Sequence, residues 1–452
     1  MHIPPKILLV SANICVEPYP VFPLGIACLQ SYINKKFGNW EVHTFDFNLG
    51  NYEDFEALLK QGQFDYIGVS LRNCDDINFY AQRSFFGHYE KIAESIRRCS
   101  QAKFLIGGPC VSVFPAETLE VLQADYAIVG EGEQSLCELI CKLETGENVE
   151  QVEGLCFRKN GEVVINKREH FLSELVIDFD PELADYYFTQ SGVLNIQTKR
   201  GCPYNCIYCS YPLIDGKEVR TLDCKMVVEN IERLTKEQKI KYIFFTDSVF
   251  NISEEYNIEL ANRIIEKGIS VNWGTYFMPK NFKKETLQLY RKAGLTHIEF
   301  GSDSFSDTQL ENYKKHFRFS DIQASSQMCN ELGIFYAHFL ILGGVGETDE
   351  TLDETFRNCQ ALPNTVFFPF IGMRIYPKTE LYNIAVSEKV IDSEPIVKPV
   401  YYISKKCDIS TIKEKAAQTG RSWVFPDSAK SDAIPKLRAR KRVGPLWEHL
   451  RN

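Results

Sequence analysis

One short loop with three cysteines constrains this chain more than any other feature. Within residues 198–212, TKRGCPYNCIYCSYP, the cysteines Cys202, Cys206 and Cys209 have the spacing C-x3-C-x2-C. Three thiolates on one loop can hold three irons of a [4Fe–4S] cluster and leave the fourth iron open to a small ligand. A zinc site or unrelated buried thiols are the alternatives. Zinc sites usually have four ligands, often as two C-x2-C pairs. The sequence has no second pair of this kind, so the loop predicts a cluster.

Composition indicates a soluble globular protein of two or three domains. The chain has 452 residues, of which 44% are hydrophobic and 25% are charged. No apolar run approaches the ~20 residues needed to span a membrane, and residues 1–10 predict a first strand rather than a signal peptide. Fifteen cysteines without an export signal favour a reducing cytoplasm, which a cluster also needs. A net charge of −9 argues against nucleic acid as a partner. We therefore expect a cytoplasmic protein without nucleic-acid or membrane partners.

The N-terminal part alternates short apolar segments with helical ones. Strands are predicted at residues 6–10, 42–47, 66–71, 104–108 and 126–130. Strands separated by helices predict a doubly wound, Rossmann-like parallel sheet that is covered on both faces. In such sheets ligands bind at the carboxyl ends of the strands.

Glycine and polar residues gather at those strand ends. Glycine lets a backbone approach a large flat ligand closely. Three segments, 23–26 (PLGI), 107–109 (GGP) and 125–133 (DYAIVGEGE), resemble the cobalamin-binding domain found upstream of many radical S-adenosylmethionine (SAM) domains. Many cobalamin proteins ligate cobalt through a histidine in D-x-H-x-x-G, but His2, His43 and His88 lie outside any such motif. The resemblance implies that cofactor contacts come from Gly25, Ser70, Leu71, Gly107, Gly108, Gly130, Glu131 and Gly132.

The alternation resumes after a connector. Strands are predicted at residues 193–197, 242–246, 271–276, 297–300, 335–342 and 366–371, with helices between them. Six such strands predict a partial (β/α)6 barrel, whose functional end is the carboxyl end of the strands. Asp247 and Ser248 follow the second strand, Asp303 follows the fourth, and Tyr208 precedes the third cysteine of the loop. We expect a first domain at 1–145, a connector at 146–190, the barrel at 191–385 and a small C-terminal, substrate-capping region at 386–452.

In combination these motifs resemble the cobalamin-dependent radical SAM enzymes, and they are similar to the tryptophan-methylating branch. The resemblance implies three cofactors: the [4Fe–4S] cluster, SAM and cobalamin. It implies that Tyr208 lies against the SAM adenine and that Asp247, Ser248 and Asp303 also contact SAM. Asp303 stands where the family usually has Glu. In that branch an arginine occupies the lower face of the cobalt without coordinating it, which would be Arg72 here. A salt bridge from Arg72 to Asp75 or Asp76 is the alternative.

The resemblance also implies an activity. We expect a methyltransferase that acts on an unactivated carbon of a small-molecule or natural-product substrate through methylcobalamin and a 5′-deoxyadenosyl radical. Such an enzyme needs an electron donor such as flavodoxin or ferredoxin. One alternative keeps the cofactors but catalyses a cyclisation, rearrangement or oxidation. Another is a cobalamin-carrying sensor protein with a structural cluster.

Overall fold

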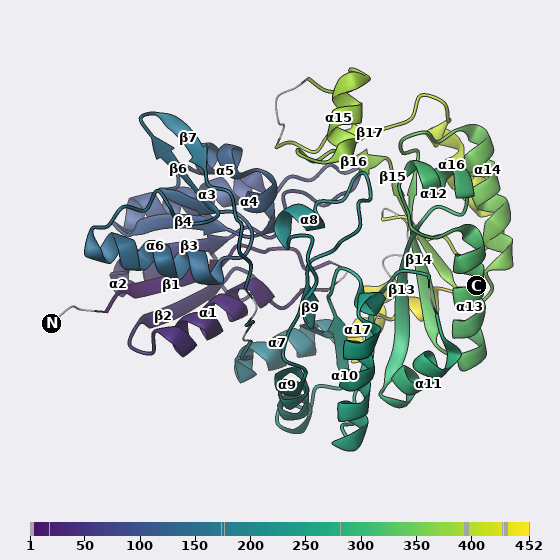
Figure 1. Ribbon diagram of the computed structural model, residues 1–452, viewed down its shortest axis with the longest axis horizontal. Coiled ribbons are helices and arrows are strands. Elements are labelled where there is room, and N and C mark those ends of the chain that lie inside the picture. Colours follow the sequence, from purple (N-terminus) through teal and green to yellow (C-terminus); the bar gives the residue numbers. More distant parts are fainter. Residues whose placement is uncertain are drawn as a thin grey trace.

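The computed structural model describes residues 4–17, 19–172, 174–175, 177–280, 282–392, 397–426, 428 and 433–451. Residues 393–396, 427, 429–432 and 452 of the expected C-terminal region therefore lie outside the described residues, as do residues 1–3. Two α/β units lie side by side, with the N-terminal one purple to blue and the second one green (Figure 1). The predicted fold class is confirmed, since a parallel sheet precedes an open, partly barrel-like one.

The first unit is built on a seven-stranded sheet with the order β2-β1-β3-β4-β5-β6-β7. Strands β1 to β5 are parallel, and the hairpin β6–β7 continues the sheet with antiparallel pairing. The strands are β1 (Lys6–Ser11), β2 (Glu41–Asp46), β3 (Tyr66–Ser70), β4 (Lys103–Gly107), β5 (Tyr126–Ile128), β6 (Leu155–Lys159) and β7 (Glu162–Ile165). The helices are α1 (Leu24–Lys36), α2 (Tyr52–Gly62), α3 (Phe86–Cys99), α4 (Pro109–Val113), α5 (Pro115–Leu122) and α6 (Glu133–Thr145).

The second unit is an open six-stranded parallel sheet with the order β15-β14-β13-β12-β11-β8. Its strands are β8 (Leu194–Ile196), β11 (Tyr242–Phe245), β12 (Asn272–Phe277), β13 (Leu295–Asp303), β14 (Phe335–Leu342) and β15 (Val366–Ile371). Its helices are α7 (Pro181–Ser191), α8 (Tyr211–Ile214), α9 (Cys224–Lys236), α10 (Glu254–Glu266), α11 (Lys284–Lys292), α12 (Asp307–Asn312), α13 (Phe319–Leu332) and α14 (Asp349–Asn358).

Short elements complete the chain. Two small ribbons pair β9 (Lys199–Arg200) with β10 (Arg220–Thr221), and β16 (Met373–Arg374) with β17 (Tyr401–Tyr402). The C-terminal helices are α15 (Glu380–Ser387), α16 (Ile412–Gln418) and α17 (Ala433–Ala439). The last turn, Trp447–Leu450, packs against the inner face of β14 and β15.

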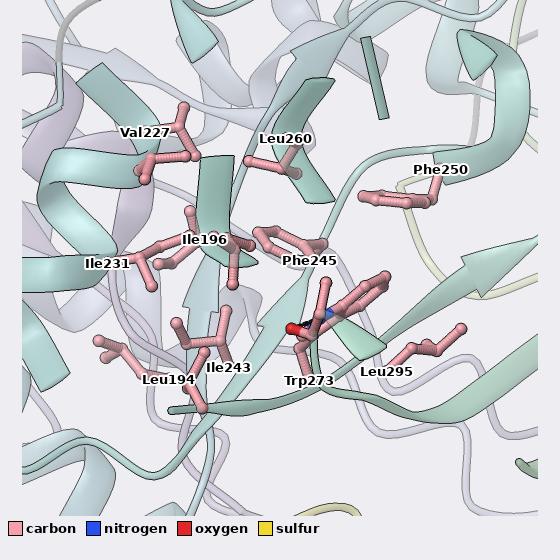
Figure 2. Close-up of a cluster of buried hydrophobic side chains, with 14 of the residues drawn as sticks. Leu194, Ile196, Val227, Ile231, Ile243, Phe245, Phe250, Leu260, Trp273 and Leu295 are labelled. Carbon is pink, nitrogen blue, oxygen red and sulfur yellow. Dashed lines mark hydrogen bonds between the residues drawn. The ribbon is translucent and has the colours of Figure 1, made fainter. Parts of the chain in front are cut away.

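The outer face of the second sheet is covered by helices. Alternate residues of each strand, such as Ile196, Phe245 and Ile298, pack against apolar residues of α9, α10, α11 and α13. Trp273 lies in the middle of this cluster, against Phe245 (Figure 2). The strand residues that alternate with these outward-facing ones therefore point to the inner face of the sheet. The helices do not cover this inner face, so it is available for a site.

The sequence predicted the positions of the strands well, but it predicted the residues at which they begin and end less well. Strands β14 and β15 have the predicted bounds, because long apolar runs between polar turns leave little ambiguity. Strand β13 runs to Asp303, beyond its predicted end. Within the predicted connector, the hairpin β6–β7 pairs with β5 and so extends the first sheet. The short helix α4 between Gly108 and Phe114 was not predicted.

Candidate active site

A cavity lies between the two units, at the carboxyl ends of the first sheet. Its volume is about 410 Å³. The first unit contributes Gly25, Ser70, Arg72, Gly107, Gly108, Gly130, Glu131 and Gly132 to its wall. The second unit contributes Gln197, Arg200, Tyr211, Ile214, Asp215 and Thr246. One cavity therefore gathers most of the residues that the sequence predicts for cobalamin, and it reaches the cysteine loop.

The glycines of this cavity form a cradle that suits a large ligand. Gly108 has φ +98°, and a Cβ there would lie 2.9 Å from the carbonyl oxygen of Leu71, so only glycine fits without strain. A Cβ at Gly25 would approach no protein atom closer than 3.9 Å, because the space above it belongs to the cavity. These residues fit a cobalamin that lies on bare backbone at the strand ends.

Arg72 lies in the cavity wall with an exposed side chain. It makes no hydrogen bond or ion pair with any residue that the structure describes. Asp75 is paired with Arg374, Nε to Oδ2 at 2.8 Å, and Asp76 accepts bonds from backbone N–H groups of its own loop. The alternative of an Arg72 salt bridge to Asp75 or Asp76 is therefore wrong, and the guanidinium is free to face a ligand.

Leu71, which was predicted to contact cobalamin, does not line the cavity. Its side chain is fully buried in the hydrophobic core of the first unit, and it is not part of the cavity wall. Its backbone N–H donates to Gly107 and its carbonyl accepts from Cys110, so Leu71 shapes the loop under the cavity. A direct contact of its side chain with a cofactor is not supported.

Glu131 joins the two units. Its Oε1 accepts from Arg220 at 2.6 Å and from Arg200 at 3.2 Å, while Arg200 also donates to Glu133 at 2.8 Å. All four side chains are at most 10% exposed. Buried charges are tolerated when they are paired in this way. The carboxylate of Glu131 thus aligns the Gly130–Gly132 loop with the ribbon that leads into the cysteine loop, and sequence reasoning missed Arg200 as its partner.

The cysteine loop begins at a glycine that the fold requires. Gly201 has φ +90°, and a Cβ there would lie 1.9 Å from the carbonyl oxygen of Glu218. After this turn the backbone N–H of Cys209 donates to the carbonyl of Cys206 at 3.1 Å. Burial raises the pKa of all three thiols, to about 12 for Cys209, and the charges of Cys202 and Cys206 add to the effect at Cys209.

Three neighbouring thiols on one loop fit a [4Fe–4S] cluster. No three His, Cys, Asp or Glu residues in the described parts of the chain converge on a point that suits a single metal ion. A cluster does not need such convergence, because each cysteine binds a different iron. The donor set therefore agrees better with the cluster than with zinc.

A buried lysine that the sequence did not reveal lies beside the thiols. Lys315 Nζ is 2.8 Å from Asp303 Oδ2, and both side chains are at most 10% exposed. The Tyr208 hydroxyl donates to the same carboxylate oxygen. The Lys315 charge opposes the rise in pKa of Cys202, Cys206 and Cys209. Tyr208 and Asp303, both predicted near SAM, are thus held together next to the cluster loop.

Asp247 is already occupied by protein groups. Its carboxylate accepts from the backbone N–H of Thr198 at 2.7 Å and of Lys199 at 3.0 Å, and the Lys199 Nζ lies at 2.8 Å. Asp247 is fully buried. Its side chain therefore anchors the start of the cysteine loop. By contrast, Ser248 Oγ is buried and has no hydrogen-bond partner among the described residues, so it can accept a ligand contact.

Comparisons with known proteins agree with this division. The family model of the B12 binding domain matches residues 11–140. The family model of the radical SAM superfamily matches residues 196–359. The first match covers β2 to β5, and the second covers the cysteine loop and β11 to β14. The chain thus belongs to the class of proteins in which a B12-binding domain is followed by a radical SAM domain.

Curated relatives span most of the chain. An uncharacterized methyltransferase of Pyrococcus horikoshii is 24% identical over 409 residues, which is 87% of this chain and 86% of the relative. The tryptophan 2-C-methyltransferase of Streptomyces laurentii is 22% identical over 432 residues, or 79% of this chain and 71% of the relative.

A solved structure shows the same fold. The radical SAM methyltransferase TsrM from Kitasatospora setae, with cobalamin and a [4Fe–4S] cluster bound, has a TM-score of 0.88 at 22% identity. The likeness covers 99% of this chain and 97% of that one. The chain belongs to the cobalamin-dependent radical SAM enzymes, and the predicted family and its cofactor set are confirmed. No helix within the described ranges is long and apolar enough to cross a membrane.

Proposed function

We propose that this enzyme is a methyltransferase that moves a methyl group from SAM, by way of cobalamin, to a carbon of a small-molecule substrate. The observation that carries the proposal is the shared cavity. Its wall combines the glycine cradle of the first sheet with Tyr211 and Asp215, which follow the cysteine loop directly. A corrin in this cradle lies next to the cluster loop, as stepwise methyl transfer requires.

The protein residues have distinct roles in this proposal. When bound, the cofactors supply a reducible cluster, a methyl source and a cobalt carrier for the methyl group. Cys202, Cys206 and Cys209 hold the cluster. Tyr208, Ser248 and Asp303 line the SAM site, and Asp247 positions the loop through Lys199.

Arg72 is assigned to the lower face of the corrin. A guanidinium stays protonated and has no lone pair to give to cobalt. With cobalamin bound, its bulk and charge would keep other protein groups away from the cobalt, which would ease methyl transfer. The absence of any ion pair for Arg72 among the described residues supports this role.

The proposed function also specifies the partners of the enzyme and the roles of its domains. The substrate is a small molecule, as for the tryptophan-methylating relative, and a flavodoxin or ferredoxin supplies electrons. We assign residues 1–145 to cobalamin, 191–385 to the SAM domain and 386–452 to a capping region. The connector at 146–190 includes the hairpin β6–β7, which extends the first sheet.

The experiment uses anaerobically reconstituted holoprotein, a low-potential chemical reductant that supplies the electrons for cobalt and the cluster, and SAM with an isotope-labelled methyl group. We expect the label to move onto the bound cobalamin, with release of S-adenosylhomocysteine, before any substrate is added. Cys202→Ala, Cys206→Ala and Cys209→Ala should each lose the cluster and reductive SAM cleavage, whereas Cys137→Ala should not. SAM cleavage without transfer of the label would favour the cyclisation, rearrangement or oxidation alternative. Neither SAM cleavage nor label transfer would favour the sensor protein.

A further inference from the structure

Glu299 is a buried carboxylate on the inner face of the second sheet. Its neighbours in β13, Ile298 and Phe300, pack outward against the helices, so Glu299 points inward. It is in register with Tyr276 of β12 on one side and with Ala337 of β14 on the other. Only 6% of the residue is exposed.

Among the described residues, Glu299 forms one hydrogen bond and no ion pair. Its Oε1 accepts from the Trp447 indole N–H at 3.0 Å, and Trp447 packs in the space beside Ala337. Within the described part of the chain, its Oε2 has no hydrogen-bond partner and no Lys, Arg or His forms an ion pair with it. The nearby His297 is engaged elsewhere, with Nε2 3.2 Å from Glu448 and Nδ1 3.0 Å from the Tyr242 hydroxyl.

The inner face of the sheet is open beside Glu299. Phe277 packs outward in the hydrophobic cluster, so the preceding Tyr276 lies on the inner face, where its ring packs against Phe244 with centroids 4.9 Å apart and 40% of the residue is exposed. Tyr19 packs near Phe244 on the same face, and the Arg438 guanidinium lies 5.6 Å from its ring. Tyr19 comes just before Val21 and Phe22, which line the cobalamin cavity, so the open face lies toward that cavity.

An unpaired carboxylate in such a place is costly unless a cation joins it. Aromatic rings beside it would add cation–π attraction for the same cation. Arg438 lies over Tyr19 but forms no ion pair with Glu299 among the described residues, whereas a substrate can supply a cation. We propose that Glu299 binds a protonated amine of the substrate, with Tyr276 as a wall of that subsite.

This proposal rests on the proposed function, because it takes the open inner face to be the substrate chamber of the same enzyme. It adds the substrate class, a small molecule that carries a basic nitrogen. The amine would hold the substrate below the SAM site without taking part in the reaction, so Glu299 is a specificity-determining residue.

The test compares pairs of compounds that differ only in an amino group. L-tryptophan is paired with indole-3-propionate, and tryptamine is paired with 3-ethylindole. Each is titrated calorimetrically into anaerobic holoprotein with SAM bound. We expect at least one amine to bind more tightly than its partner by about tenfold or more, as for a hydrogen bond to a charged group. Glu299→Gln should reduce that preference to about twofold or less, while the amine-free compound binds equally to both proteins.

Glu448→Gln is the matched control, because Glu448 is another buried acid of this interior but faces His297. It should keep the amine preference. The visible spectrum of bound cobalamin and the unfolding temperature show whether each variant folds. If Glu299→Gln does not fold, the wild-type preference alone decides. Wild type without any amine preference, or Glu299→Gln with the full preference, would overturn the proposal. The label-transfer experiment needs no substrate, so its outcome is independent of this one.

Discussion

Arg374 and Asp75, which are 299 positions apart in sequence, form a fully buried ion pair, with Nε 2.8 Å from Oδ2. Arg374 belongs to the ribbon β16–β17 of the second unit, and Asp75 follows strand β3 of the first. The pair ties the two units together close in sequence to Arg72, which lines the cavity. It also satisfies the carboxylate of Asp75, and so leaves Arg72 free to face a ligand in the cavity.

The role of Arg72 can be read from the cobalt spectrum. Electron paramagnetic resonance of the wild-type cob(II)alamin form should show four-coordinate or weakly water-bound cobalt, without nitrogen superhyperfine splitting. Arg72→Ala should shift the spectrum to five-coordinate cobalt, because space opens below the corrin. Arg83→Ala is the control, since Arg83 is an exposed arginine farther along the same loop. Nitrogen splitting in the wild type would refute the assignment.

Gly108 should be essential for cobalamin binding. A methyl group at this residue would meet the Leu71 carbonyl oxygen at 2.9 Å with φ at +98°. We expect Gly108→Ala to lower the free energy of unfolding by about 1–3 kcal/mol, typical of strain at such a backbone conformation, and to weaken cobalamin binding. Gly87→Ala, in helix α3 with nothing within 4 Å of the added Cβ, should leave cobalamin binding unchanged and should not lower the free energy of unfolding. Urea unfolding and cobalamin titration measure both effects. Equal behaviour of the two variants would show that the cradle is not needed.

Lys315 should support both the cluster and SAM. Lys315→Met removes the cation that pairs with Asp303 and opposes the raised thiol pKa values, so iron content and SAM affinity should both fall, the latter by about tenfold. Lys314→Met is a close control, because Lys314 forms an exposed pair with Glu380, and such pairs contribute little. Iron analysis and anaerobic SAM titration give the result. Wild-type values for Lys315→Met would remove Lys315 from the site.

Amine binding should depend on pH. Burial raises the pKa of Glu299 to about 7, against which the Trp447 hydrogen bond acts. A raised carboxyl pKa means that the ionised form, which attracts an ammonium, is minor below pH 7 and dominant above it. Amine affinity should therefore rise from about pH 6 to about pH 8 and stay flat in Glu299→Gln. The other groups around it are Tyr276, Tyr19 with Arg438 over its ring, and the His297–Glu448 pair; burial raises the pKa of both tyrosines, which stay protonated in this range. An unchanged slope in Glu299→Gln would show that the dependence does not come from Glu299.

The sequence predicted local features and missed long-range ones. The cysteine loop and the glycine turns are contiguous motifs, and β14 and β15 are long apolar segments, so each was evident locally. The pairs Lys199–Asp247, Lys315–Asp303 and Arg200–Glu131 join distant segments, and residue type alone does not show which charges meet. For the same reason Asp247 was expected to face SAM, whereas its carboxylate is filled by Lys199 and two backbone N–H groups.

The most direct test of the central claim is a crystal structure of the anaerobic holoprotein with cobalamin and SAM. We predict that the corrin lies on Gly107–Gly108 and Gly130–Gly132 with Arg72 below the cobalt. We also predict that the cluster is held by Cys202, Cys206 and Cys209, with SAM on its fourth iron. A corrin bound outside the cavity between the two units, or a protein side chain coordinated to the cobalt, would contradict the account.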